Sequence, residues 1–176
     1  NATVYGLAPR MRFDLVVNMM TMYAWRDKKI FIMGGGEQWR PLIHVQDVGK
    51  AFVLVAESDR GTVHKQIFNV GGIGQNFRIK QIAGLVRQHV PIPVELLVIP
   101  DDADKRSYNI SFEKIKNVLG YKPDKTIPDA VHEIYDALEN RNLEPGDLKT
   151  VTVKYYQYLI KAEKTVREVS FNGKIF

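Results

Sequence analysis

One stretch in the first third of the chain contains its most informative pattern: Gly34-Gly35-Gly36-Glu37-Gln38-Trp39-Arg40-Pro41-Leu42-Ile43-His44-Val45-Gln46-Asp47-Val48. The three glycines follow a short apolar run at residues 30–33, which predicts a strand that ends in a turn. From residue 45 to residue 56, apolar side chains recur at helical spacing. Asp47 lies in the first turn, where the helix dipole favours an anion. The stretch therefore predicts a strand, a turn and an amphipathic helix.

The residues before this stretch predict one more strand and one more helix. Val4 and Tyr5 are typical of the end of a strand. Residues 13–25 predict a helix whose apolar face carries Phe13, Val16, Val17, Met20 and Ala24.

After the stretch, short strands and helices continue to alternate. Strands are predicted at residues 66–70 and 94–99, and helices are predicted to begin at the caps Asn76, Ser111 and Thr126. The alternation indicates an α/β protein, but the strands are too few for a complete doubly wound nucleotide-binding sheet.

Three local signals concern the end of the chain. Gly120 lies where a helix C-terminus favours a left-handed residue. Residues 150–164 alternate like a strand but also fit a helix, and we favour the helix. Asn172-Gly173 is a hairpin dipeptide, but too few residues follow it for a proper returning strand.

Composition narrows the class of protein. The chain has 176 residues, 45% hydrophobic and 26% charged, which is enough for one sizeable core. No apolar run approaches the roughly 20 residues of a membrane helix. The absence of cysteine excludes disulfides, a thiolate nucleophile and a zinc–thiolate site, and it suits a cytoplasmic protein. Asn1 is not an initiator Met and no signal peptide follows it, so we expect that it is not a natural start.

The charge of the chain does not choose a partner by itself. The formal net charge is +5 and the pI is about 9.3. The basic residues lie in short groups, without the interleaved aromatic side chains that single-strand binders use. Nucleic-acid binding is therefore disfavoured, and solvated lysines are the simpler interpretation.

The opening stretch resembles the glycine, arginine, aromatic or apolar, His-Val-x-Asp-Val signature in the C-terminal half of extended short-chain dehydrogenases/reductases. That family includes UDP-glucose 4-epimerase and the nucleotide-sugar 4,6-dehydratases. Three further elements resemble the family's and occur in its order: Thr3-Val4-Tyr5-Gly6, Ile67-Phe68-Asn69-Val70-Gly71 and Leu119-Gly120-Tyr121-Lys122-Pro123. The resemblance covers roughly residues 1 to 160 and implies the C-terminal, substrate-binding portion of a Rossmann-type epimerase or dehydratase.

Two hallmarks of the family's redox chemistry are not found in the sequence. Family members bind NAD through a Gly-x-x-Gly-x-x-Gly turn, whereas the glycines at 34–36 and 71–74 lack that spacing. The family's base is a Tyr-x-x-x-Lys pair on one helix. The one match is Tyr121/Lys125, where Pro123 argues against a shared helical face. We expect both hallmarks to lie before Asn1, and no catalytic residue in this chain.

The resemblance assigns several residues to a nucleotide-diphosphate site. Arg40 matches the arginine that contacts the diphosphate, a task for which a guanidinium fork is well suited; a surface ion pair is the alternative. Phe31 and Met33 alternate along the predicted strand and match positions that line the base pocket, with core packing as the alternative for Met33.

Asp14 and Leu15 match positions that contact the nucleotide. Epimerases commonly have Asn at the first of these positions, and a carboxylate near phosphates is unfavourable unless Arg10 or Arg12 offsets it. Thr3 stands where many relatives have an Asn that touches the substrate.

Asp104, Arg106 and Tyr108 resemble the late Asp-x-x-x-Tyr stretch that closes over the nucleotide. Arg106 is offset from the usual arginine, and an ion pair with Asp101 or Asp102 is its alternative role. The acidic cluster that contains these two residues is interpreted as solvated.

His44 and Asp47 lie one turn apart but have no third ligand at suitable spacing. We therefore interpret both as structural and expect no metal site.

The resemblance implies a parent enzyme that oxidises a sugar hydroxyl with bound NAD and then epimerises (isomerase) or dehydrates (lyase) the sugar. Residues 1–165 would supply the substrate-binding portion with the last Rossmann elements, and 166–176 a tail. The expected partners are a nucleotide-diphosphate sugar, an N-terminal NAD-binding domain and, as an option, a second copy. This fragment alone is expected to be inactive and not to bind NAD tightly. The alternative is a noncatalytic nucleotide-sugar-binding or interaction module.

Overall fold

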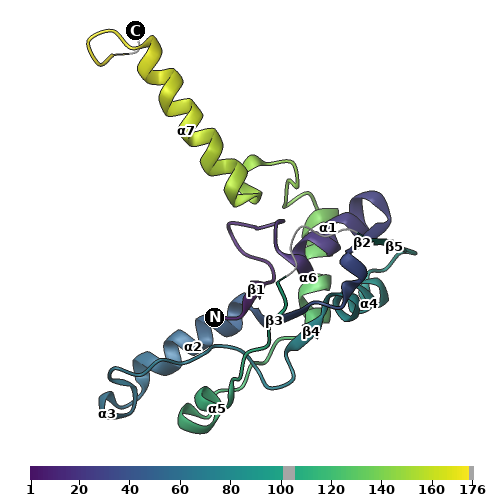
Figure 1. Cartoon of the computed structure of the whole chain (residues 1–176), viewed down its shortest axis with the longest axis vertical. Coiled ribbons are helices and arrows are strands. Elements are labelled where there is room, and N and C mark those ends of the chain that lie inside the picture. Colours follow the sequence, from purple (N-terminus) through teal and green to yellow (C-terminus); the bar gives the residue numbers. More distant parts are fainter. Residues whose placement is uncertain (101–105, 175–176) are drawn as a thin grey trace.

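The computed structural model describes residues 1–100 and 106–174, which form an α/β body and one projecting helix (Figure 1). The strands are β1 (Thr3–Tyr5), β2 (Lys29–Met33), β3 (Trp39–His44), β4 (Asn76–Arg78) and β5 (Glu95–Ile99). The helices are α1 (Val16–Asp27), α2 (Val45–Glu57), α3 (Arg60–Val63), α4 (Ile79–His89), α5 (Glu113–Leu119), α6 (Ile127–Glu139) and α7 (Thr152–Val169), with short 3-10 turns η1 (Gly34–Gly36) and η2 (Leu148–Thr150).

The strands of the described residues lie in two small sheets. β1 and β3 are parallel, with Tyr5 opposite His44, and β3 is antiparallel to β4. β2 and β5 are parallel, and Met33 lies opposite Ile99. Parallel pairs need crossover connections, which the helices between these strands provide. Each sheet is only part of a doubly wound sheet, as the sequence predicts.

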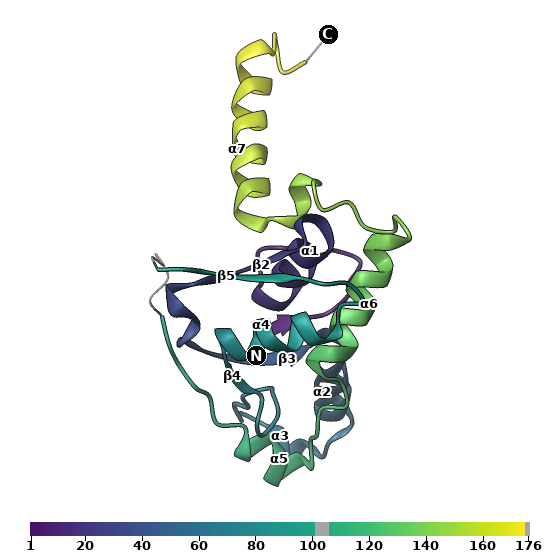
Figure 2. The ribbon, with the colours of Figure 1, turned by 90° about the vertical axis from the view of Figure 1, so that its right-hand side faces the viewer.

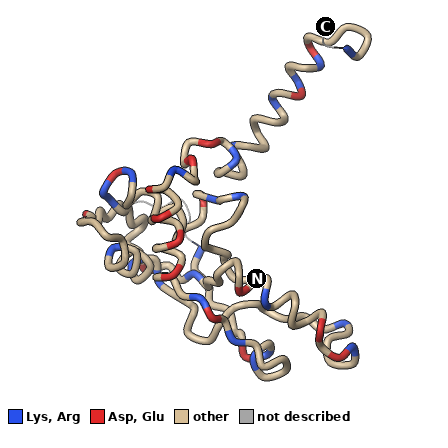
Figure 3. Tube along the Cα trace, turned by 180° about the vertical axis from the view of Figure 1, so that it is seen from behind, with Lys and Arg blue, Asp and Glu red and all other residues tan. Residues whose placement is uncertain are grey.

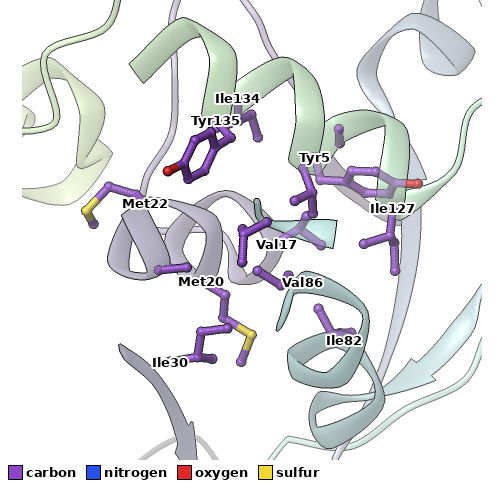
Figure 4. Close-up of a cluster of buried hydrophobic side chains, with 14 of the residues drawn as sticks. Tyr5, Val17, Met20, Met22, Ile30, Ile82, Val86, Ile127, Ile134 and Tyr135 are labelled. Atoms are coloured by element: carbon purple, nitrogen blue, oxygen red, sulfur yellow. The ribbon is translucent and has the colours of Figure 1, made fainter. Parts of the chain in front are cut away.

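The main hydrophobic core lies between α1, α4 and α6 and extends onto β2 (Figure 4). Val17 and Met20 of α1 face Ile82 of α4 and Ile134 of α6 in this cluster, and all four are almost completely buried. Burying a side chain of this size contributes about 1.5–3 kcal/mol. The apolar face predicted for residues 13–25 therefore lies in this core, where it holds α1 in a fixed position.

A smaller cluster connects β1 and β3 with α2 and α5 at the opposite end of the body from α7 (Figure 2). Its buried residues include Ile43, Ala51, Phe112, Ile115 and Tyr121. Gly120, at φ +65°, ends α5 in the left-handed conformation that its position predicts. Thr126 caps α6, as predicted, by accepting from the backbone N–H of Asp129.

The sequence left residues 150–164 open between strand and helix, and the structure confirms the helix. α7 projects from the body, and none of its residues is buried (Figure 1). Its base is attached by the Phe13 N–H, which donates to the Thr150 carbonyl over 2.8 Å. The helix continues to Val169. The end of the substrate-binding portion at residue 165 stays a prediction. Asn172-Gly173 forms a turn closed by a single bridge between Phe171 and Lys174.

Three local expectations were wrong or incomplete. Residues 66–70 form no strand in the described chain, because a single backbone hydrogen bond, from Ala2 N–H to the Val70 carbonyl, joins this segment to the β1 side. Asn76 does not cap α4; it lies in β4, and its side-chain amide exchanges two hydrogen bonds with the backbone of Ile110. The sequence also gave no signal for β3, which contains Pro41.

The charges are spread over the molecule. Basic and acidic residues are interspersed along the trace in the view of Figure 3, consistent with the scattered groups in the sequence. Within the described ranges, no helix combines the length and apolar character that crossing a bilayer requires.

Candidate functional site

A cavity of about 350 Å³ opens where the start of α1 meets β1, β2 and β3. Five of the residues that line it are ones that the sequence assigns to a nucleotide site: Thr3, Asp14, Leu15, Phe31 and Met33. They come from three segments that are separated along the chain. Met33 retains 38% of its surface, which disfavours the alternative that it packs in the core.

Two arginines and Tyr108 also line the cavity. Arg40 lies in β3, and Arg106 lies in the segment that follows β5. The Arg40 guanidinium donates to the carbonyls of Trp39 and Arg106, and it lies 5.8 Å from the centre of the Tyr108 ring. These contacts hold the guanidinium in place, because a fork with occupied donors loses rotational freedom. The predicted contact residues that are described therefore share one cavity, whereas Asp104 lies outside the described residues, as do Asp101 and Asp102.

The segment 106–108 is attached to the start of β3 by its backbone. The Trp39 N–H donates to the Ser107 hydroxyl over 3.1 Å, and the Tyr108 N–H donates to the Trp39 carbonyl over 3.4 Å. Both arginines are thus positioned by the same short contact between β3 and a segment more than sixty residues later.

The carboxylate of Asp14 is paired. Arg12 donates from Nε to Oδ1 over 3.0 Å and from Nη2 to Oδ2 over 2.9 Å. These hydrogen bonds raise the pKa of Arg12 above its ordinary value. Of the two arginines that the sequence offers as compensation for Asp14, the structure selects Arg12, while Arg10 lies over the Tyr155 ring at 5.9 Å.

Leu15 immediately precedes α1 and has an extended backbone, and no side chain caps the helix. The first turn of a helix presents backbone N–H groups without intrahelical partners, and its dipole favours an anion. Leu15 and Val16 line the cavity, so this helix end faces the same space as Arg40 and Arg106.

A second polar cluster joins the β3–α2 junction to α6. His44 is fully buried; its Nδ1 accepts from the Gln46 N–H, so its Nε2 carries the proton and donates to Glu133 over 3.2 Å. Glu133 also accepts from Lys125 over 2.8 Å. Gly6 is required beside this histidine, because its φ is +106° and a Cβ there would lie 2.3 Å from His44 Nε2.

Asp47 belongs to the same cluster and is 2% exposed. Its two carboxylate oxygens accept from the backbone N–H groups of Asp124 and Lys125, at 2.8 and 3.0 Å. These contacts agree with the structural roles expected for His44 and Asp47. Asp47 therefore holds a loop more than seventy residues away, a contact that no local pattern around residue 47 predicts.

The Tyr121/Lys125 match does not form a catalytic pair. Both residues lie in the loop before α6, so they share no helical face, as Pro123 predicts. The Tyr121 hydroxyl donates to the Asp47 carbonyl over 2.9 Å, and burial raises the pKa of Tyr121. A catalytic tyrosine base needs a lowered pKa.

Acid is expected to destabilise this cluster through His44. Burial, the dominant cause, lowers the pKa of His44 below its ordinary value of 6.5, although Glu133 opposes the change. Below about pH 6.5 the unfolded chain therefore binds more protons at this residue than the folded chain does. The contribution of neutral His44 to stability is complete above pH 6.5 and decreases as the pH falls through the lowered pKa. Urea unfolding between pH 5 and 8 should show this slope.

The control is His44→Asn, which keeps a helix-capping oxygen but removes the titrating ring. The variant should be less stable at neutral pH and should lose part of the slope between pH 5 and 6.5. An unchanged slope would show that other groups cause the acid sensitivity.

A larger cavity of about 550 Å³ lies elsewhere, between the loop at Gly71 and Gly72, α5 and Tyr121. None of the residues assigned from the sequence lines it. The smaller cavity is the candidate site, because Arg40, Arg106 and the N-terminal end of α1 all line it.

Comparisons with known proteins show similarity to nucleotide-sugar epimerases. Residues 2–71 match the model of the NAD dependent epimerase/dehydratase family. UDP-glucose 4-epimerase of Corynebacterium glutamicum is 36% identical over 92 residues, which are 52% of this chain and 27% of that protein. CDP-paratose 2-epimerase of Salmonella typhi is 24% identical over 112 residues, or 62% of this chain and 33% of that protein.

The fold is also found in solved structures. UDP-glucuronic acid 4-epimerase from Bacillus cereus, in complex with UDP-glucuronic acid and NAD, matches with a TM-score of 0.62 and 22% identity. The match covers 80% of this chain and 44% of that one. The chain thus has the α/β fold of Rossmann-type epimerase/dehydratase structures with part of their sheet. The matches support that family for this chain, which spans less than half of the length of these relatives.

Proposed function

We propose that this chain is the substrate-binding part of an NAD-dependent nucleotide-sugar epimerase or dehydratase, and that the cavity beside α1 holds the nucleotide diphosphate. One observation carries the proposal: residues from four separated segments meet Arg106 around a single cavity. They lie at positions 3, 14, 15, 31, 33 and 40. The matches to nucleotide-sugar epimerases support the substrate class.

Each part of the cavity has a task in this proposal. Arg40 and Arg106 bind the phosphates with charge-assisted hydrogen bonds, and the open end of α1 adds backbone N–H donors. Phe31 and Met33 provide an apolar wall for the base. Phe31 is supported from behind by Tyr23, whose ring meets it edge-on at 5.5 Å. Thr3 supplies a hydroxyl towards the sugar.

NAD would serve as the hydride acceptor and donor in the intact enzyme. The sequence has no Gly-x-x-Gly-x-x-Gly turn of the kind that holds NAD, so the residues of this chain do not fit this cofactor. In this proposal a further domain binds NAD and carries out the redox chemistry.

That further domain is the main proposed partner. In this proposal, residues 1–165 form the substrate-binding portion with the last Rossmann elements. The outer side of α2 and the following segment expose Phe52 and Ile67, which are 69% and 83% accessible. Exposed apolar side chains of this size would be covered at an interface between domains. An NAD-binding α/β domain would cover it in the intact enzyme, and a second copy of this chain is the other candidate.

The test is to separate binding from turnover in the purified chain. Calorimetry should detect UDP binding and no tight NAD binding, and assays with NAD and UDP-glucose should give no epimerised or dehydrated product. The reason is that this chain contains the proposed phosphate site but no Tyr-x-x-x-Lys pair on one helix. Turnover would contradict the assignment of the chemistry to another domain, and the absence of UDP binding would contradict the site itself.

A further inference from the structure

We infer that Arg12 is a positioning residue of the nucleotide site, and that its pair with Asp14 is what allows a cavity with a carboxylate in its wall to accept a diphosphate. The inference rests on the proposed function. It goes further by assigning a role to a residue outside the cavity lining.

The pair is built for charge compensation. The two oxygens of Asp14 accept from Nε and Nη2, which form one edge of the Arg12 guanidinium, at 3.0 and 2.9 Å. The Asp14 side chain is 22% exposed and the Arg12 side chain 44%, so the carboxylate is the more enclosed member. A bidentate fork fixes the direction of the carboxylate as well as neutralising it.

Arg12 is held in place independently of Asp14. The buried amide of Asn18 in α1 donates from Nδ2 to the Arg12 carbonyl over 3.1 Å and accepts from the Gly6 N–H over 3.0 Å. Phe13, next to Arg12, is 4% exposed and packs in the main core. The backbone at Arg12 and Phe13 is therefore anchored to α1 and the main core. Arg10 lies over the Tyr155 ring and not beside Asp14.

The electrostatic need for such a pair follows from the lining. Asp14 lines the same cavity as Arg40 and Arg106. An unpaired carboxylate there would repel phosphate oxygens and compete for the two arginines, since charges a few ångströms apart in a partly enclosed site interact strongly. Paired with Arg12, the carboxylate is neutralised locally, so it repels the phosphates less and competes less with them for Arg40 and Arg106.

The ligand's charge provides a readout that a merely structural role would not affect. If Arg12 acts by neutralising Asp14, its loss weakens ligands in proportion to their phosphate charge. UDP should be affected most, UMP less and uridine least. If Arg12 only holds the loop, all three ligands should weaken alike.

The experiment is a double-mutant cycle in the full chain, with UDP and UMP measured by calorimetry and uridine by NMR titration. Arg12→Ala should weaken UDP binding about tenfold or more, because it leaves an uncompensated carboxylate beside the phosphates. In the Asp14→Asn background, where no carboxylate remains to be compensated, the same Arg12→Ala change should alter UDP binding by less than about threefold. High salt should reduce the loss caused by Arg12→Ala.

A matched control lies at the other end of α1. Arg26 makes a similar bidentate pair with Asp27, away from the cavity, so Arg26→Ala should leave UDP binding unchanged. If Arg12→Ala does not fold, Arg12→Gln keeps much of the side chain without its charge and should show the same loss. A double variant as weak as Arg12→Ala, or an equal loss for uridine, would overturn the inference.

The two levels of the hypothesis can be told apart. A wild-type chain that does not bind UDP overturns both the proposed function and the role of Arg12. Binding that is lost in Arg40→Ala but is not rescued in the Arg12/Asp14 double variant overturns the role of Arg12 alone.

Discussion

Replacing Arg40 with alanine should weaken UDP binding by about 10- to 100-fold, because hydrogen bonds from a charged group contribute about 1.5–3 kcal/mol. The guanidinium is already oriented by the carbonyls of Trp39 and Arg106 and by the Tyr108 ring. Little rotamer entropy is therefore lost when it binds a phosphate. Calorimetric titration of UDP into the variant and the wild type measures the difference directly.

Lys28→Ala is the control for general electrostatics. It removes one positive charge that lies outside the cavity, where the ammonium donates to the Trp25 carbonyl. A solvated lysine contributes little to binding, so we expect a change of less than about threefold. Equal losses in the two variants would mean that net charge, and not a positioned fork, attracts the nucleotide.

Much of the fold could be predicted because local patterns and packing agree. The apolar stripes at Val17 and Met20, and at Ile134 and Leu138, both face the main core. Caps gave a mixed result. Thr126 begins α6 as expected, whereas Asn76 is taken by the backbone of Ile110. A competing long-range partner of that kind leaves no trace in the local sequence.

The strand expected at residues 66–70 shows a second limit of local patterns. Its composition favours an extended backbone, but residues 66–70 carry no assigned secondary structure. A strand also needs a partner along its length, and in the described residues Ala2 supplies only one hydrogen bond to Val70. β3 is the converse case. Its run from Trp39 to His44 pairs on both sides, although Pro41 argues against a strand.

The candidate site was predicted through family resemblance and not through periodicity. Phe31 and Arg40 could be assigned because their positions match a known signature, and both line the cavity. The Arg12–Asp14 pair could be anticipated only as one of two options, since sequence spacing does not reveal where a guanidinium points. The tie from Asp47 to the loop at Asp124 was not foreseeable, because nothing near Asp47 in the sequence marks a partner so distant.

Asp47→Ala should destabilise the chain by about 3 kcal/mol or more, although the residue lies outside the candidate site. The buried carboxylate accepts two backbone hydrogen bonds, at 2.8 and 3.0 Å from Asp124 and Lys125. Each bond to a charged acceptor contributes about 1.5–3 kcal/mol, and its loss leaves an unsatisfied N–H group. Domains of this size have total stabilities of about 5–15 kcal/mol, so the variant should lose a large fraction of its stability. Urea unfolding followed by circular dichroism measures the loss.

Asp124→Ala is the matched control, because it changes an aspartate in the same loop without touching these bonds. Its carboxylate pairs with Lys50 at 2.6 Å and is 67% exposed, so its loss should cost less than about 1 kcal/mol. Asp47→Asn should fall between the two, since the amide keeps one acceptor oxygen but turns a donor towards the other N–H group. If Asp47→Ala proved no less stable than Asp124→Ala, the loop at 124–125 would not depend on this carboxylate. The junction of β3, α2 and α6 would then be held by the remaining contacts, which include the His44–Glu133 contact, the Tyr121 hydrogen bond to the carbonyl of residue 47 and the apolar cluster.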